Sequence, residues 1–296
     1  QITGYFPLSE SNIDYLSQYK KPKKFLSYNA NLHGHRLFTS LSLFSRELDK
    51  YGLISMLNRS DVTKSELEGE MIYFFQYQHQ EGGHPHYDRE IKKDERATID
   101  LLDKFYDKFP ITLDIDIEFL HGDDTVFQNT LRKKYKFNDE IESKINQIRT
   151  DRFITIEHHL DTYFSVISET SINNQHSGWS NDELVHICEK TYKGLASPHP
   201  FILFANDGVL KYLKSLGFKT FPEMFDESYD EEKDTLKRFK MVLDEIEKLC
   251  KMDEKKLHQK FVKTLSNIKH NHNLLLSFDR EELLLGILKE ISNVGQ

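Results

Sequence analysis

Residues 164–230 read FSVISETSINNQHSGWSNDELVHICEKTYKGLASPHPFILFANDGVLKYLKSLGFKTFPEMFDESYD, and this stretch decides the fold. Its apolar runs at 163–167 and 200–204 suit buried parallel strands, and a helix beginning at Glu189 lies between them. The turn NDG, a second helix and a short strand at 216–221 (LGFKTF) follow. Glu169 comes directly after the first strand, and Glu189 opens the helix that follows. Both glutamates therefore lie where such a unit meets a ligand. The pattern predicts half of a nucleotide-binding α/β domain.

The residues that precede this stretch predict a second strand-loop-helix-strand unit. Residues 23–30 (KKFLSYNA) are a strand candidate, and the loop NANLHGHR leads into a helix over 36–52 with apolar residues three or four apart. Gly52 is expected to close that helix before a strand at 53–57. An earlier helix is expected to begin at a cap formed by Ser9 or Ser11.

The middle and the end of the chain are less regular. We expect a strand at 71–80, a helix at 94–109 capped near Asp94, an alternating strand at 109–119 and a charged helix at 138–152. Nearly everything after residue 230 is predicted helical, including a last helix at 279–294. The expected organisation is 1–57 as the first part of the α/β domain, 58–150 as an inserted or second, acceptor-side region, 151–235 as the nucleotide-binding half, and 236–296 as C-terminal helices that pack on the core.

Composition narrows the class of protein. The chain has 296 residues, 38% of them hydrophobic and 30% charged, as in soluble globular proteins. No window approaches the run of about 20 apolar residues that a membrane span needs. A net charge of −8 argues against general nucleic-acid binding. Cys188 and Cys250 are too few for a disulfide framework, and we expect a reducing, cytoplasmic location, which for a viral protein would be the host cytoplasm.

Two helix starts carry charged residues suited to a phosphorylated ligand. Glu189, Lys190 and Thr191 open one predicted helix, where unpaired backbone N–H groups and a partial positive charge favour phosphate. Taken alone, this pattern favours a capping carboxylate beside an exposed lysine. Arg36, at the start of the other helix, suits bidentate contact with a diphosphate, although it equally fits a surface ion pair. His35 adjoins it in the loop.

The motifs together resemble the donor-binding half of GT-B glycosyltransferases, most closely the exostosin-like and fucosyltransferase-like families and glycosyltransferase-like proteins of viruses and bacteria. EKTYKGLASPHPFILF resembles the helix and strand that hold the donor nucleotide, with SPHP in place of the usual glycine-rich lead. FSVISET is similar to the strand and acidic loop beside the donor, and KKFLSYNANLHGHR is similar to the opening strand and basic helix start. These motifs cover about half the chain.

The resemblance implies a Rossmann-like, GT-B-type sheet domain with a long helical C-terminal region. It implies a metal-independent transferase that moves a hexosyl or pentosyl group from a nucleotide-sugar donor to a glycan or other hydroxyl acceptor, with no separate cofactor. The implied donor-binding residues are Arg36, His35, Glu169, Glu189, Lys190 and Thr191. For the catalytic base, the candidates are His84, His86 and Asp88 in the middle loop. The alternative is a non-catalytic nucleotide-binding or structural module of a larger protein, with a viral protein among the candidates.

Other polar clusters have simpler explanations. The histidines at 33–35, 84–86 and 158–159, with Asp114 and Asp116, lack the spacing of a known metal motif. The Asp114-x-Asp116 pair resembles the metal-binding DxD of the GT-A glycosyltransferase fold, and both carboxylates share one face of an alternating strand; the same pattern is typical of a strand face exposed to water, which we favour. In DESYD, residues 226–230, we expect Asp226 or Asp230 to cap a helix and the tyrosine to pack on the sheet.

Overall fold

A computed structural model describes residues 8–29, 31–56, 61–77, 90–111, 113, 156–172, 185 and 187–277. The elements before residue 113 are α1 (Glu10–Gln18), β1 (Lys23–Asn29), α2 (Gly34–Ser45), β2 (Gly52–Met56), α3 (Lys64–Tyr77), α4 (Lys93–Ile99) and α5 (Leu101–Phe105). The later elements are α8 (Ile156–Leu160), β3 (Thr162–Ser168), α9 (Glu189–Ala196), β4 (Phe201–Phe204), α10 (Val209–Ser215), α11 (Thr235–Lys251) and α12 (Glu254–Ser277). The predicted strands at 23–30, 53–57, 163–167 and 200–204 are confirmed as β1, β2, β3 and β4.

The described part of the chain is an α/β structure built on one four-stranded sheet. The strand order is β2-β1-β3-β4, and every neighbouring pair is parallel. Ser27 lies between Ile54 of β2 and Val166 of β3, and Val166 lies beside Ile202 of β4. Segments from 1–57 and from 151–235 therefore contribute to the same sheet, which joins the two sequence units side by side.

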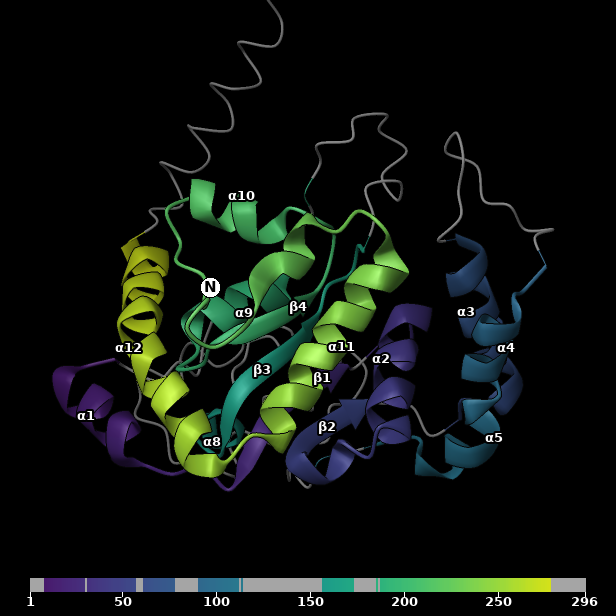
Figure 1. Cartoon of the computed structure of the whole chain (residues 1–296), viewed down its shortest axis with the longest axis horizontal. Helices are drawn as coiled ribbons and strands as arrows, with labels where there is room; N and C mark the ends of the chain where they lie inside the picture. The colour runs from purple at the N-terminus through teal and green to yellow at the C-terminus, as the bar shows by residue number, and fades with distance from the viewer. Residues whose placement is uncertain are drawn as a thin grey trace, which may run out of the picture.

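Helices cover both faces of this sheet (Figure 1). On one face, Phe239 of α11 meets Phe204 of β4 with ring centroids 4.9 Å apart, and Phe38 of α2 contacts the same Phe239 at 6.2 Å. On the other face, α9 packs so closely that a side chain at Gly194 would strike Ile167 and Phe201. This arrangement suits strands that are buried on both sides, which explains their continuous apolar runs.

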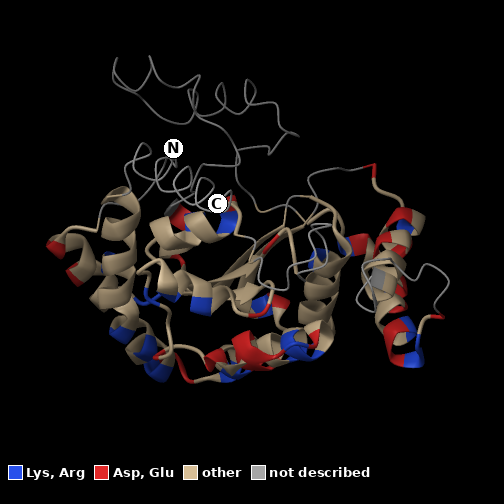
Figure 2. Ribbon diagram, turned by 90° about the horizontal axis from the view of Figure 1, so that it is seen from above, with Lys and Arg blue, Asp and Glu red and all other residues tan. Residues whose placement is uncertain are grey.

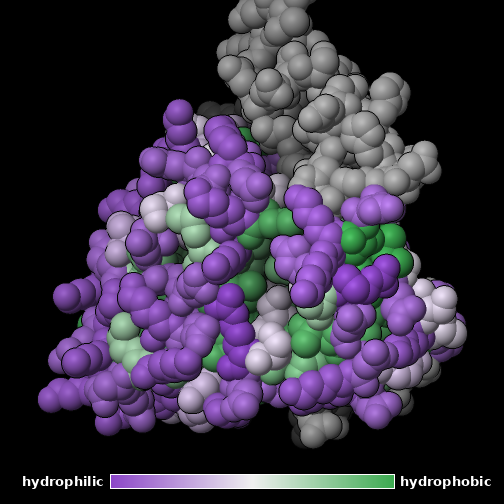
Figure 3. Space-filling view, turned by 45° about the vertical axis from the view of Figure 1, so that its right-hand side comes forward, coloured by the Kyte–Doolittle hydropathy of each residue, from purple (hydrophilic) through white to green (hydrophobic). Residues whose placement is uncertain are grey.

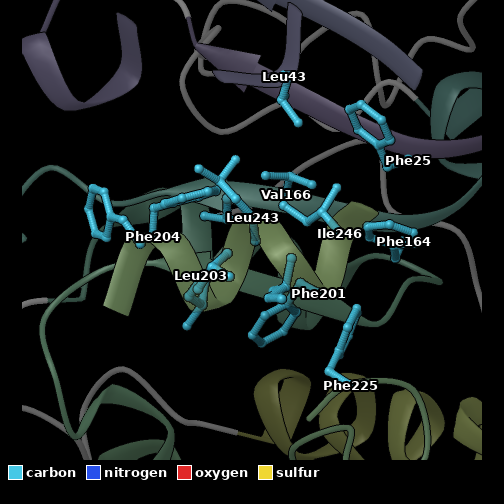
Figure 4. Close-up of a cluster of buried hydrophobic side chains, with 14 of the residues drawn as sticks. Phe25, Leu43, Phe164, Val166, Phe201, Leu203, Phe204, Phe225, Leu243 and Ile246 are labelled. Atoms are coloured by element: carbon cyan, nitrogen blue, oxygen red, sulfur yellow. The ribbon is translucent and has the colours of Figure 1, made fainter. Parts of the chain in front are cut away.

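The core lies between the sheet and its helices (Figure 4). Phe25, Val166 and Phe204 from three strands meet Leu243 and Ile246 of α11, and all five side chains are buried. The apolar residues Phe239, Leu243, Ile246 and Leu249 recur at the helical period along α11, and all four are buried. Burying such an amphipathic face, rather than helix propensity, supplies most of the stability of a helix like this.

The prediction of a strand at 71–80 is wrong, because residues 64–77 form α3. Leu67, Met71, Phe74 and Phe75 are buried at a helical spacing, so the apolar run has the helical period over a longer window. The helix packs against α2 at Gly34, where an added Cβ would lie 2.2 Å from the Glu70 carbonyl oxygen. A third layer of helices, α3, α4 and α5, therefore lies outside α2 (Figure 1).

Three other boundaries differ from expectation. Gly52 begins β2 instead of ending the preceding helix, which already ends at Ser45. Residues 216–221 form no strand; this segment is held by α12, where Asn271 exchanges hydrogen bonds of 2.7 Å with the backbone of Lys219 in both directions. α4 begins after Lys92, whose N–H donates to Glu95 at 2.8 Å, instead of at Asp94.

Other expectations from the sequence are confirmed. Ser9 caps α1 by accepting the N–H of Asn12 at 3.3 Å. Within 226–230, Asp230 accepts the N–H groups of Leu210 and Lys211 at 2.9 and 3.0 Å and thereby caps α10. Most of the expected strand at 109–119 and all of the expected helices at 138–152 and 279–294 lie outside the described residues.

The face of the described part that Figure 3 shows is mostly hydrophilic, with smaller apolar areas between the polar side chains. Figure 2 shows lysines and arginines interspersed with acidic residues on the helices drawn. Within the described part of the chain, no helix combines the length and apolarity needed to cross a bilayer.

Candidate functional site

The strand order creates a switch point at the carboxyl edge of the sheet. From β1 the chain passes through α2 to β2 on one side, and β3 lies on the other side of β1. The connections that leave β1 and β3 therefore diverge, and in open parallel sheets ligands bind in the crevice that this divergence leaves. Arg36 on α2, and Glu169 and Thr170 after β3, lie at this edge.

Arg36 projects from the first turn of α2 toward the end of β3. Its Nη2 donates to the Thr170 hydroxyl at 3.4 Å and its Nη1 to the Asn31 carbonyl oxygen at 3.3 Å. Only 1% of the residue is exposed, and its Nε has no partner among the described residues. Burial lowers the pKa of Arg36, and the charges of Cys188, Glu189 and Glu169 partly oppose that change. The surface ion pair that the sequence equally allowed is not formed with any described carboxylate.

Lys190 reaches the same hydroxyl from α9. Its Nζ lies 3.5 Å from Thr170 Oγ1, 3.4 Å from Cys188 Sγ and 2.5 Å from Glu189 Oε1. Both members of the Glu189–Lys190 pair remain partly exposed. Burial acts to raise the pKa of Glu189, but the hydrogen bond and the charge of Lys190 hold that pKa below its usual range. Two cations from different helices thus converge on Thr170.

Glu169 is fully buried and caps α9 from outside the helix. Its carboxylate accepts the N–H of Cys188 at 3.2 Å and the N–H of Thr191 at 3.3 Å, and it also accepts the Thr191 hydroxyl. The N–H of Thr170 donates to the same carboxylate at 3.2 Å. The sequence suggested that the start of this helix binds phosphate, whereas the structure fills that position with the protein's own carboxylate. Glu169 and Thr191 therefore position Lys190 and Glu189.

His35 joins α2 to the end of β3. Its Nε2 forms a 2.7 Å hydrogen bond with the backbone oxygen of Glu169, and its ring stacks on His33 at 5.6 Å. The residue is buried, so its contact is with the backbone of the site. Glu70 of α3 lies at the start of α2, where burial raises its pKa and the N–H of Gly34 opposes that shift. Both helix starts at this edge thus face a glutamate.

Cys188 is a half-buried thiol at the same edge. Burial and the neighbouring Glu169 raise the pKa of this thiol to about 11. A thiol with so high a pKa carries little thiolate at neutral pH and is a poor nucleophile. Its place in the site is that of a small group packed between Lys190 and Thr170.

The other histidine and aspartate candidates lie on α8 or outside the described residues. His84, His86, Asp88, Asp114 and Asp116 lie outside the described residues. His158 and His159 lie on α8, where His159 packs against His199 with ring centroids 5.0 Å apart. Over the described ranges, no group of three or more histidine, cysteine or acidic side chains is arranged to hold a metal ion.

Two residues of this region were not predicted from the sequence. Thr170 is contacted by both Arg36 and Lys190, and Arg238 holds neighbouring backbone segments by hydrogen bonds. Arg238 donates to the carbonyl oxygens of Ala205, Ile172 and Glu232 at 3.0, 2.8 and 2.7 Å. The position of Thr170 directly after a strand and an acidic residue was a usable signal. Arg238 lies within a charged helix and offered none.

Comparisons of the chain with protein-family models, with curated proteins and with solved structures found no match. The geometry and the sequence motifs are therefore the basis for an assignment of function.

Proposed function

We propose that the switch-point edge binds the phosphate groups of a nucleotide sugar, and that the protein transfers the sugar to a hydroxyl acceptor. The observation that carries the proposal is the convergence of Arg36 and Lys190, from two separate helices, on Thr170. Two adjacent cations at the ligand-binding edge of a parallel sheet match the charge of a diphosphate.

Arg36 supports the proposal most strongly because its charge is buried and poorly satisfied. A buried charge is costly unless it is paired and hydrogen-bonded, and Arg36 has two long hydrogen bonds to neutral oxygens and an unused Nε in the described structure. Arg238, which is equally buried, instead donates hydrogen bonds to backbone carbonyl oxygens. An anion at the edge would supply the acceptor that Arg36 lacks.

Lys190 and Glu189 fit a ligand with both phosphate and hydroxyl groups. A diphosphate would compete with Glu189 for Lys190, and the released carboxylate could then accept the two hydroxyls of a ribose. Because Glu169 already occupies the start of α9, recognition of phosphate rests on these side-chain cations instead of on helix N–H groups. This changes the mode of binding that the sequence suggested but keeps its central residues.

In the proposed reaction, the bond between the sugar carbon and the diphosphate oxygen breaks while that carbon bonds to the acceptor oxygen. The acceptor proton passes to a base, and the nucleoside diphosphate leaves with the electron pair. Arg36 and Lys190 would stabilise the charge that develops on the leaving group. His84, His86 and Asp88 stay the sequence-based candidates for the base, and a GT-B-type arrangement with 58–150 on the acceptor side stays part of the proposal.

The test is isothermal calorimetry with UDP, GDP, ADP and CDP on wild type and on the variants Arg36→Ala and Lys190→Ala. We expect one diphosphate to bind to wild type. Each variant should lower the affinity for it at least tenfold, which is a loss of about 1.4 kcal/mol or more of binding free energy. Absence of binding by every diphosphate would overturn the proposal, and full affinity in both variants would show that the site is elsewhere.

Turnover separates an enzyme from a binding module. Wild type should hydrolyse or transfer the matching nucleotide sugar, and Glu189→Ala should lose that activity. Binding with no turnover of any matching nucleotide sugar, in the presence of simple sugar acceptors, would instead favour the non-catalytic nucleotide-binding module.

A further inference from the structure

Two fully buried polar side chains lie at the ends of the two strands that flank the switch point. Asn29 ends β1 and Ser168 ends β3, and both are 0% exposed. Asn29 Oδ1 and Ser168 Oγ have no hydrogen-bond partner among the described residues. The register that pairs Ser27 with Val166, continued by two residues, places Asn29 beside Ser168 on the same face of the sheet.

The chemistry of this pair differs from that of the neighbouring cations. Asn29 donates through Nδ2 to the Ser27 hydroxyl at 3.2 Å, which leaves its carbonyl oxygen as the group that lacks a partner. That oxygen can only accept a hydrogen bond, whereas the Ser168 hydroxyl can donate or accept. Arg36 Nε, which also has no partner among the described residues, can only donate.

Buried polar atoms without partners are rare in native proteins, and each needs an explanation. Here three of them lie on β1, β3 and the first turn of α2, which are the elements that form the switch point. A phosphate satisfies Arg36, but a largely ionised phosphate offers few hydrogens to the Asn29 oxygen. A ligand that satisfies all three atoms must carry hydroxyl or N–H groups beside its phosphate.

We infer that Asn29 and Ser168 form a neutral subsite that binds hydroxyl groups of the transferred sugar of the donor. The inference rests on the proposed function and extends it, because it separates the residues that read the sugar from those that hold the diphosphate. Glu189 begins α9, where it contacts Lys190, and is left for the ribose. Asn29 and Ser168 therefore determine which sugar is bound, and Arg36 contributes to the affinity for every phosphorylated ligand.

The test compares a nucleoside diphosphate with its sugar conjugate, for example UDP with UDP-glucose and GDP with GDP-mannose, by calorimetry. We expect Asn29→Ala and Ser168→Ala each to lower the affinity for the nucleotide sugar at least fivefold. The affinity for the diphosphate should change less than twofold. Equal weakening of both ligands would overturn the inference, because it would place the ribose or the phosphates at this pair.

Ser165→Ala is the matched control. Ser165 is buried on the same strand, on the opposite face, and its hydroxyl is hydrogen-bonded to His199 Nδ1 at 2.9 Å. This variant should lower the unfolding midpoint of the free protein and leave both affinities unchanged. Ser168→Ala should leave that midpoint unchanged or raise it, because it removes a hydroxyl without a partner.

The outcomes distinguish the inference from the proposed function. If wild type binds no diphosphate, the proposed function fails. A second outcome refutes the subsite alone. In it, wild type binds a diphosphate and Arg36→Ala does not, while Ser168→Ala lowers the unfolding midpoint and leaves the affinity for the nucleotide sugar unchanged.

Discussion

Among the described residues, Arg36 and Arg238 are buried arginines, and replacing each by methionine tests whether its charge serves stability or ligand binding. Arg36 and Arg238 are both 1% exposed, yet their acceptors differ. Arg36 donates to groups on the exposed residues Asn31 and Thr170, which water can solvate once the arginine is gone. Arg238 donates to the carbonyl oxygens of Ala205 and Ile172, which are on fully buried residues.

The expected magnitudes follow from these acceptors. Each buried group left without a partner costs about 1–3 kcal/mol, so Arg238→Met should lower the free energy of unfolding by about 2–6 kcal/mol. Arg36→Met leaves no buried acceptor of this kind and removes a poorly satisfied buried charge. Its free energy of unfolding should change by less than about 1 kcal/mol or increase, as when buried ionic groups are replaced by apolar ones.

The assay is urea denaturation at neutral pH followed by the helical circular dichroism signal. The two variants have the same substitution at the same degree of burial, so each serves as the control for the other. A loss above about 2 kcal/mol in Arg36→Met would show that Arg36 is a structural residue like Arg238. It would also remove the observation that carries the proposed function.

Three further outcomes are expected. Gly34→Ala should destabilise the protein by about 1–3 kcal/mol in thermal unfolding, because the new Cβ would lie 2.2 Å from the Glu70 oxygen, whereas Gly69→Ala meets nothing within 4 Å and should be neutral or stabilising. Glu169→Gln should lower the stability by about 1–3 kcal/mol in the same measurement through loss of the charged cap of α9; an unchanged midpoint would contradict that role. His199 is fully buried, and burial, followed by the nearby His159 and Lys21, lowers its pKa well below 6.5. The unfolded state therefore binds more protons as the pH falls below 6.5, so the free energy of unfolding should fall over that range, and less steeply in His199→Gln, when urea midpoints are compared across pH.

The strands were predictable because their signal is local. The strands predicted from the apolar runs at 163–167 and 200–204 are confirmed as β3 and β4. The strands predicted at 23–30 and 53–57 are confirmed as β1 and β2. The error at 71–80 has the opposite cause. A short apolar run fits a strand and a buried helix equally well, and the helical period becomes visible only when Leu67 is included with Met71 and Phe74.

Local sequence patterns are enough to predict the α/β class, the start of α9 at Glu189 and the presence of Arg36 and Lys190 at two helix starts. The contact of both cations with Thr170, and the capping of α9 by Glu169, depend on how the strands and helices pack. The reason is physical: periodicity and capping act within a few residues. The meeting of side chains more than 130 positions apart depends on which strands lie side by side, and here β1 and β3 are neighbours.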